Sequence, residues 1–169
     1  NCFLKRNGQL IHDAEVFDIN HGKGVFDVFS RKGQFQAPCL VLAAGLGNRK
    51  LAPLIGLKQP VRPQKGQILV TQKIDKLIDV PMTLLRQTAE GSVMIGDSKE
   101  EVGFDISSSI DIMAQIADRA RRTLPVLEKQ QIIRSWAALR VMSPDGFPMY
   151  DQSESCPGGF AITCHSGVT

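Results

Sequence analysis

Arg140 is the residue whose type and setting most directly predict chemistry in this chain. It lies near the end of a strand-like apolar run, residues 132–141, just before the turn at residues 143–146 (SPDG). A guanidinium placed beside apolar groups is costly without an anionic partner. Its planar pair of donors fixes the orientation of a carboxylate as well as its charge. Arg140 therefore either binds the carboxylate of a ligand or forms a structural ion pair with Asp145 or another acid.

A second candidate is the small-residue tip Ala43, Ala44 and Gly45, within the longest apolar run, residues 39–46. Small residues let a backbone or a ligand approach closely. A strand, then glycines, then a helix is where α/β proteins bind nucleotides. The chain has no GxGxxG, and tight packing alone would also explain this tip. Asn48 is expected to cap the short helix that follows.

The hydrophobic pattern predicts the elements that must position these residues. The run at residues 39–44 (CLVLAA) is expected to be a strand covered on both faces. The stretch at residues 61–71 is expected to break at Gly66, and Lys65 to face solvent. Residues 105–124 repeat their apolar positions at three and four, which predicts a long helix. Strands are expected at residues 8–19 (as one or two), 25–30, 36–44, 67–71, 81–86, 92–96, 132–141 and 160–164, with a short apolar run at 147–150.

Composition narrows the class of protein. The chain has 169 residues, of which 43% are apolar, so it can form a core. With 20 basic and 17 acidic residues, one Trp and one Tyr, it gives no reason to expect nucleic acid as a partner. The four cysteines lie singly and the three histidines lack metal-ligand spacing, so we expect free thiols in the cytoplasm and no metal. Asn1 is not Met and Thr169 follows a strand-plus-glycine pattern, so we expect a fragment of a longer protein.

Five segments occur in an order that resembles a known family. They are the meander ending in VLAAGLG, then VRPQKGQILVT, LLRQTAEGSVMIGDSKEEVGFD, SWAALRVMSPDGFPMYD and GFAITCHSGVT. The series resembles the FAD-dependent amine and amino-acid oxidoreductases, which include D-amino acid oxidase, glycine oxidase and sarcosine oxidase. The closing CHSGVT is most similar to the branch of the opine oxidase and hydrogen cyanide synthase flavoprotein subunits.

The resemblance implies a reaction and a role for two arginines. An amino acid or secondary amine (glycine, a D-amino acid, sarcosine or an opine-like compound) binds over the flavin, and a hydride passes from the carbon that bears nitrogen to the flavin. A dedicated catalytic base is not required if the substrate reacts as its neutral amine. Arg140 matches the family's carboxylate-binding arginine. Arg86, in the hairpin, matches a position on the active-site side, although an exposed strand arginine explains it equally well.

The resemblance also implies which residues contact FAD. Val16 matches a strand position at the adenine end, where a simple core role is an equal alternative. The tip Ala43, Ala44 and Gly45 matches the segment that lies against the cofactor. Backbone amides of the loop at the flavin ring can stabilise the reduced, anionic flavin. That loop consists of His165, Ser166 and Gly167, of which the histidine could instead cap a strand end.

The resemblance gives an α+β fold: an antiparallel sheet with one long crossing helix, plus a partial FAD-binding lobe with a three-stranded β-meander. Residues 1–60 would belong to that lobe, 61–142 to a substrate-binding domain, and 143–169 again to the lobe. The dinucleotide fingerprint is absent, so most of the FAD phosphate site would lie outside this chain, and the isolated fragment is expected to be inactive. The alternatives are a non-catalytic binding module without the cofactor and a nucleotide-binding regulatory domain.

Partners follow from the same resemblance. The opine and cyanide-forming relatives work as electron-chain-linked, multi-subunit enzymes, which favours a dehydrogenase over an oxidase. The resemblance therefore allows partner redox subunits, or a homo-oligomer, and peripheral association with the inner face of the membrane through an electron-transfer chain. The substrate would be a small amino acid or amine.

Overall fold

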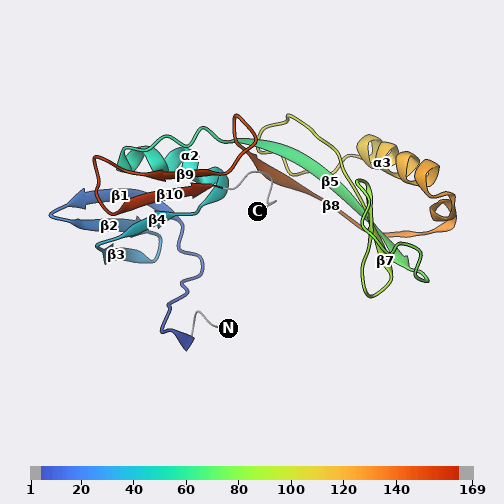
Figure 1. Ribbon diagram of the computed structural model, residues 1–169, viewed down its shortest axis with the longest axis horizontal. Helices are drawn as coiled ribbons and strands as arrows, with labels where there is room; N and C mark the ends of the chain where they lie inside the picture. The colour runs from blue at the N-terminus through green and yellow to red at the C-terminus, as the bar shows by residue number, and fades with distance from the viewer. Residues whose placement is uncertain (1–4, 164–169) are drawn as a thin grey trace. The chain divides into compact units, whose positions relative to one another are not determined.

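The computed structural model describes residues 5–163, and the chain divides into two compact units (Figure 1). Unit 1 combines the residues up to Val61 with those from Ser143 onward, and unit 2 is Arg62–Met142. The sheets are mainly antiparallel and the helices few, so the fold class is α+β, as predicted.

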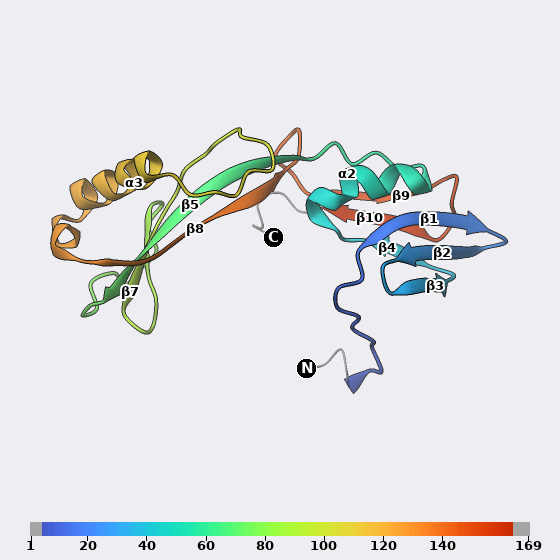
Figure 2. The same cartoon turned by 180° about the vertical axis from the view of Figure 1, so that it is seen from behind.

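Unit 1 begins with an antiparallel meander of three strands (Figure 2). The strands are β1 (Val16–Gly22), β2 (Val25–Ser30) and β3 (Gly33–Ala37). Lys23 and Gly24 join β1 to β2 with φ angles of 52° and 75°, the left-handed pair that a two-residue hairpin requires. The strand predicted from residue 8 begins only at Val16. Leu10 and Ile11, which suggested the earlier start, are exposed.

Strands β4 (Leu40–Leu42), β9 (Met149–Gln152) and β10 (Gly159–Thr163) form a second sheet of unit 1, and the short helices η1 (Gly45–Gly47), α2 (Asn48–Leu51) and η2 (Ala52–Ile55) follow β4. The strand order is β4-β10-β9, with β10 parallel to β4 and antiparallel to β9. The single strand predicted over residues 36–44 is divided between β3 and β4. Its two-sided burial is also wrong, because Val41 is 51% exposed while Leu42 is buried. Alternating exposure is what a sheet with one open face produces.

The core of unit 1 joins the meander to the second sheet. Phe26 from β2 and Ile55 from η2 are fully buried, and Ile19, Leu42 and Ala161 belong to the same cluster. Because these residues come from both ends of the sequence, residues 143–163 are part of the same core as residues 16–61.

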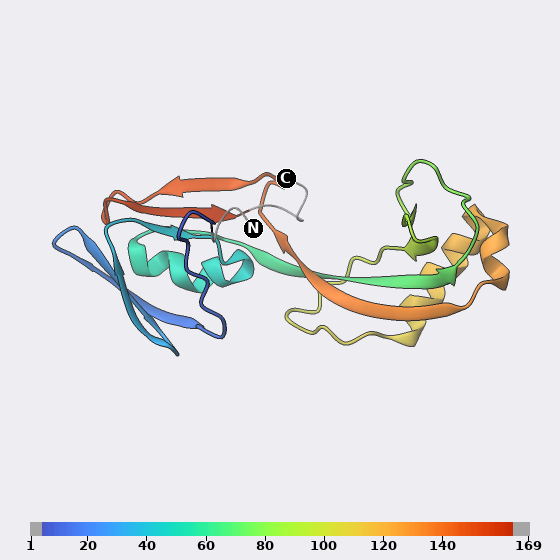
Figure 3. The ribbon, with the colours of Figure 1, turned by 90° about the horizontal axis from the view of Figure 1, so that it is seen from below.

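Unit 2 contains one antiparallel sheet and the long helix α3 (Ile110–Thr123), which is followed by η3 (Pro125–Lys129). The sheet has the order β6-β7-β5-β8 and consists of β5 (Arg62–Lys73), β6 (Leu85–Gln87), β7 (Ser92–Ile95) and β8 (Ile132–Met142). Strands β5 and β8 form a long twisted ribbon, green and orange in Figure 3. Buried Ile116 and Ala120 on α3 pack against the sheet residues Leu69, Val93 and Ile95.

Two predictions about unit 2 are wrong in an informative way. Strand β5 does not break at Gly66, which pairs with Ala138 in a continuous register. The helix begins at Ile110 rather than at residue 105, and Ser109 holds its N-cap position. The Asp105 carboxylate instead binds Lys65, a partner 40 residues away in the sequence.

Candidate functional site

Arg140 lies on β8 opposite Gln64 of β5. Its Nη2 donates to Asp97 Oδ2 at 2.9 Å, and its Nη1 donates to the carbonyl oxygens of Ser98 at 2.9 Å and Lys65 at 3.4 Å. The side chain is 24% exposed. The acid beside Arg140 is therefore Asp97 and not Asp145. Within residues 5–163, acceptors contact Nη1 and Nη2 but not Nε, so Nε and one N–H of Nη2 keep their donor capacity.

Asp97 is the site residue that sequence reasoning missed. It follows β7, and its carbonyl oxygen accepts a hydrogen bond from Arg119 of α3. The pairing of β7 and β8 on opposite edges of β5 brings it to Arg140 across 43 residues of sequence. No local motif marks such a pair, so only the sheet order reveals it.

Lys65, expected to face solvent, is instead 3% exposed. Its ammonium binds Asp105 Oδ2 at 2.8 Å, the Ser107 carbonyl oxygen at 3.0 Å and Glu100 Oε2 at 3.3 Å. The backbones of Lys65 and Glu100 also exchange two hydrogen bonds of 2.9 Å. These contacts hold residues 97–109, the "97–109 segment", against strand β5. The same segment carries two of the oxygen acceptors that surround Arg140.

Gln67, fully buried on β5, extends this attachment. Its amide nitrogen Nε2 donates to Glu100, and its Oε1 accepts from the backbone N–H of Ser109 at 3.0 Å. Its own backbone N–H donates to Ser98 Oγ at 2.9 Å. Burial raises the pKa of Glu100, but hydrogen bonds from Ser98, Gln67 and Lys65 outweigh it, so the net pKa is lowered. The buried polar groups are mutually satisfied, which makes the arrangement rigid.

The Lys65–Asp105 pair gives a pH-dependent prediction. The Lys65 hydrogen bond, supported by the Ser107 backbone N–H, lowers the pKa of Asp105 from 3.8 to about 2. A lowered folded-state pKa adds stability above the unfolded pKa, and this stability is lost as the pH falls from about 4 to about 2. Asp105→Asn should therefore reduce the stability to urea at pH 7, and the deficit should shrink below pH 4. Asp75→Asn is the control, because no ion pair to Asp75 occurs in residues 5–163. A deficit that is the same at pH 7 and pH 2 would contradict the assignment.

Arg86 does not join Arg140. It is exposed on β6 opposite Met94 of β7, and Met94 in turn lies opposite Val70 of β5. Val70 pairs with Arg134 on β8, six residues from Arg140. Across the sheet, Arg86 is therefore aligned with Arg134, and its substrate-binding role stays a prediction.

Of the predicted cofactor residues, four lie in the described part. Val16 is half-buried and packs against the unit 1 core. Ala43 and Ala44 are exposed, and Gly45 has a φ of 56°. His165, Ser166 and Gly167 lie outside the described residues. The tip therefore presents small, exposed residues on a tight turn, an arrangement that admits close approach of a large planar ligand such as FAD.

Asn48 holds that tip in place instead of capping the helix. The N-cap position of α2 belongs to Gly47, which makes no side-chain cap. Asn48 is fully buried; its Oδ1 accepts from the backbone N–H of Ala44 at 3.0 Å. Its Nδ2 contacts the carbonyl oxygens of Leu42 and Ile162 and the hydroxyl of Thr163. One side chain thus ties the tip to strands β4 and β10.

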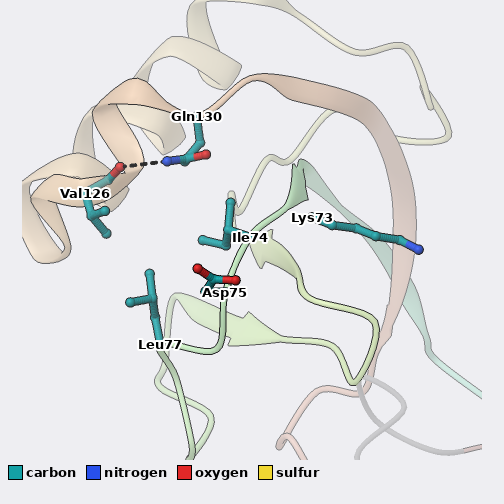
Figure 4. Close-up of a pocket in the computed structure, with 6 residues that line it drawn as sticks. All are labelled: Lys73, Ile74, Asp75, Leu77, Val126 and Gln130. Carbon is teal, nitrogen blue, oxygen red and sulfur yellow. Dashed lines mark hydrogen bonds between the residues drawn. The ribbon is translucent and has the colours of Figure 1, made fainter.

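A hollow of about 580 Å³ in unit 2 lies at the end of β5 remote from Gln64, the residue opposite Arg140. Figure 4 shows Lys73 extending away from the other lining residues, and Gln130 donating to the Val126 carbonyl oxygen at 3.3 Å. The polar groups that line this hollow do not converge on a common point (Figure 4). The hollow therefore adds nothing to the arginine site.

Comparison with known proteins identifies the class. A family model described as FAD dependent oxidoreductase matches residues 2–169, so the chain belongs to that family. This confirms the predicted family and its cofactor, FAD. The chain is 47% identical over 144 residues to an opine oxidase subunit of Agrobacterium tumefaciens (strain Ach5), covering 85% of this chain and 37% of that protein. It is 33% identical over 122 residues to hydrogen cyanide synthase subunit HcnC of Pseudomonas aeruginosa, covering 69% and 29%.

Solved structures agree on the fold. The crystal structure of glycine oxidase from Geobacillus kaustophilus matches with a TM-score of 0.87 at 23% identity, over 94% of this chain and 44% of that one. L-proline dehydrogenase from P. horikoshii matches with a TM-score of 0.86 at 21% identity, over 97% and 47%. The chain thus spans less than half the length of these relatives. No helix within residues 5–163 is long and apolar enough to cross a membrane.

Proposed function

We propose that the full-length protein oxidises the C–N bond of a small amino acid or secondary amine, such as glycine, a D-amino acid, sarcosine or an opine-like compound. The observation that carries the proposal is Arg140. Its guanidinium is partly exposed and held at Nη1 and Nη2, and its Nε has no acceptor within residues 5–163. Membership of the FAD-dependent oxidoreductase family supplies the chemical context.

Separate tasks follow for the two units. In unit 1, the tip Ala43–Gly45 would face the cofactor, and Asn48 would keep that tip from collapsing. In unit 2, Arg140 would bind the substrate carboxylate and so orient the carbon that bears nitrogen. FAD, when bound, accepts the hydride that this carbon loses. The described residues are assigned binding and orientation, and no proton transfer is assigned to them.

We further infer that the protein is a dehydrogenase subunit rather than a self-sufficient oxidase, located in the cytoplasm. Two of its relatives are named as subunits, one of opine oxidase and the other, HcnC, of hydrogen cyanide synthase. Partner redox subunits, with peripheral attachment to an electron-transfer chain at the inner membrane face, would then take the electrons. A homo-oligomer is the competing assembly.

The full-length protein tests this directly. It should be yellow when purified, and a small amino acid or secondary amine added without oxygen should bleach its absorbance near the visible flavin band. Recovery of colour with an artificial electron acceptor, but slowly with oxygen, is expected for a dehydrogenase. A colourless protein, or one that no amine bleaches, would favour a non-catalytic binding module.

Asp97→Asn tests the arginine site, because the direction of the change in acetate affinity is predicted. Asparagine keeps an oxygen acceptor for Nη2 but removes a negative charge that repels a ligand carboxylate. We expect acetate to bind roughly three- to tenfold more tightly, a modest effect because Asp97 is 37% exposed and its charge is screened. Calorimetric titration with acetate, and with neutral acetamide as a control, measures the change. Weaker acetate binding would mean that the Asp97 charge is needed to hold the guanidinium.

A further inference from the structure

The Arg140 side chain crosses the neighbouring strand at Gly66. A Cβ atom built on Gly66 would lie 2.5 Å from both Nη1 and Nη2 and 2.6 Å from Cζ of Arg140. Carbon and nitrogen atoms that are not bonded normally stay about 3.5 Å apart or more. The guanidinium therefore occupies the space that any other side chain at position 66 would fill.

The backbone conformation at position 66 does not require a glycine. It is buried in the middle of β5, it pairs with Ala138 in register, and it is absent from the glycines with positive φ. Glycine in a strand interior costs stability, because it gains no packing and loses more backbone entropy on folding. A glycine with ordinary strand geometry in the middle of a strand often indicates that another group lies close to the backbone. At Gly66 that group is the Arg140 guanidinium.

Protein acceptors hold the same guanidinium at Nη1 and Nη2. Asp97 and the Ser98 carbonyl oxygen belong to the 97–109 segment, and the Lys65 carbonyl oxygen belongs to β5. The Lys65 and Gln67 side chains tie that segment to the strand on both sides of Gly66. Gly66 thus lies beneath the guanidinium, and the acceptors that hold the guanidinium are themselves fixed by these contacts.

We propose that Gly66 is a positioning residue for ligand binding: it leaves open the space in which the Arg140 guanidinium lies and can face a carboxylate. This inference rests on the proposed carboxylate-binding function of Arg140. It adds that the affinity for a carboxylate depends on the absence of a Cβ atom at position 66 of the neighbouring strand. Gly66 acts through Arg140 and not by contact with the ligand.

The proposal predicts that binding and stability separate in Gly66→Ala. The group that must move is the end of a long, flexible side chain, so the fold can accommodate the new methyl group by displacing the guanidinium. We expect the Kd for acetate to rise at least tenfold, close to that of Arg140→Leu, while the thermal midpoint stays within a few degrees of that of the parent. A residue needed only for the fold would show the reverse.

The experiment uses the full-length, FAD-loaded protein and calorimetric titration with acetate. Gly22→Ala is the matched control, because a Cβ at that strand glycine meets nothing within 4 Å. The double variant Gly66→Ala with Arg140→Leu should bind acetate no worse than Arg140→Leu alone, because the clash no longer exists. Gly66→Ser, with a larger side chain, should weaken binding at least as much as Gly66→Ala.

The outcomes distinguish the role of Gly66 from the carboxylate-binding role of Arg140. If Arg140→Leu weakens acetate binding and Gly66→Ala does not, the role of Gly66 is overturned and the proposed function stands. If Arg140→Leu binds acetate as the parent does, the proposed function itself fails. Should Gly66→Ala fail to fold, recovery of folding in the double variant would support the steric coupling, and failure of both would overturn it.

Discussion

Arg140→Leu is expected to lower kcat/KM for an amino-acid substrate of the full-length protein by about 10²- to 10³-fold, since a two-point contact to a carboxylate is lost. Leucine cannot pair with the substrate carboxylate, and it leaves Asp97 as an unpaired negative charge beside the site. Arg140→Lys should recover only part of the loss, because an ammonium supplies the charge but not the planar pair of donors. Steady-state kinetics with an artificial electron acceptor measures the effect.

The controls separate substrate binding from general damage. Arg134 is an arginine on the same strand whose guanidinium lies over the Trp136 ring, 5.2 Å from its centroid, so Arg134→Leu should leave kcat/KM nearly unchanged. An amine substrate without a carboxylate should lose far less activity in Arg140→Leu than an amino acid does. An equal loss for both substrates would show that Arg140 acts on the fold and not on the carboxylate.

Asn48→Ala is expected to destabilise the protein by about 3 kcal/mol, because a fully buried amide that makes several hydrogen bonds is removed and its partners are left unsatisfied. The groups that lose the Asn48 amide as a partner include the backbone N–H of Ala44 and the carbonyl oxygen of Leu42. Urea unfolding of the full-length protein measures the change in stability. Release of FAD on dilution measures whether the tip Ala43–Gly45 still helps to bind the cofactor.

Asn20→Ala serves as the comparison for Asn48. Asn20 is exposed on β1, so its removal should change stability by less than about 0.5 kcal/mol. If Asn48→Ala lowered stability but FAD were retained as tightly as in the parent protein, the tip would be structural and its contact with the cofactor would be contradicted.

Local chemistry was the most predictable part of this molecule. The strand predicted at residues 25–30 follows from residues that are adjacent in sequence, and the structure places it there as β2. The apolar repeat within residues 105–124 correctly predicted a helix. Its start was wrong: Ser109 holds the N-cap position, and the Asp105 carboxylate binds the buried Lys65. The strand predicted from residue 8 starts only at Val16, because apolar residues alone do not supply a pairing partner.

The sequence by itself determined the family, the α+β class and the choice of Arg140 as the carboxylate candidate, since these depend on residue types and on the order of motifs. Only the tertiary structure decided that Asp97 is the acid at Arg140, that Lys65 is buried, and that Gly66 makes room for the guanidinium. Each of these depends on which strands are neighbours in a sheet. Strand order is set by the burial of a whole core rather than by local pattern, so contacts across 43 residues cannot be read from either partner alone.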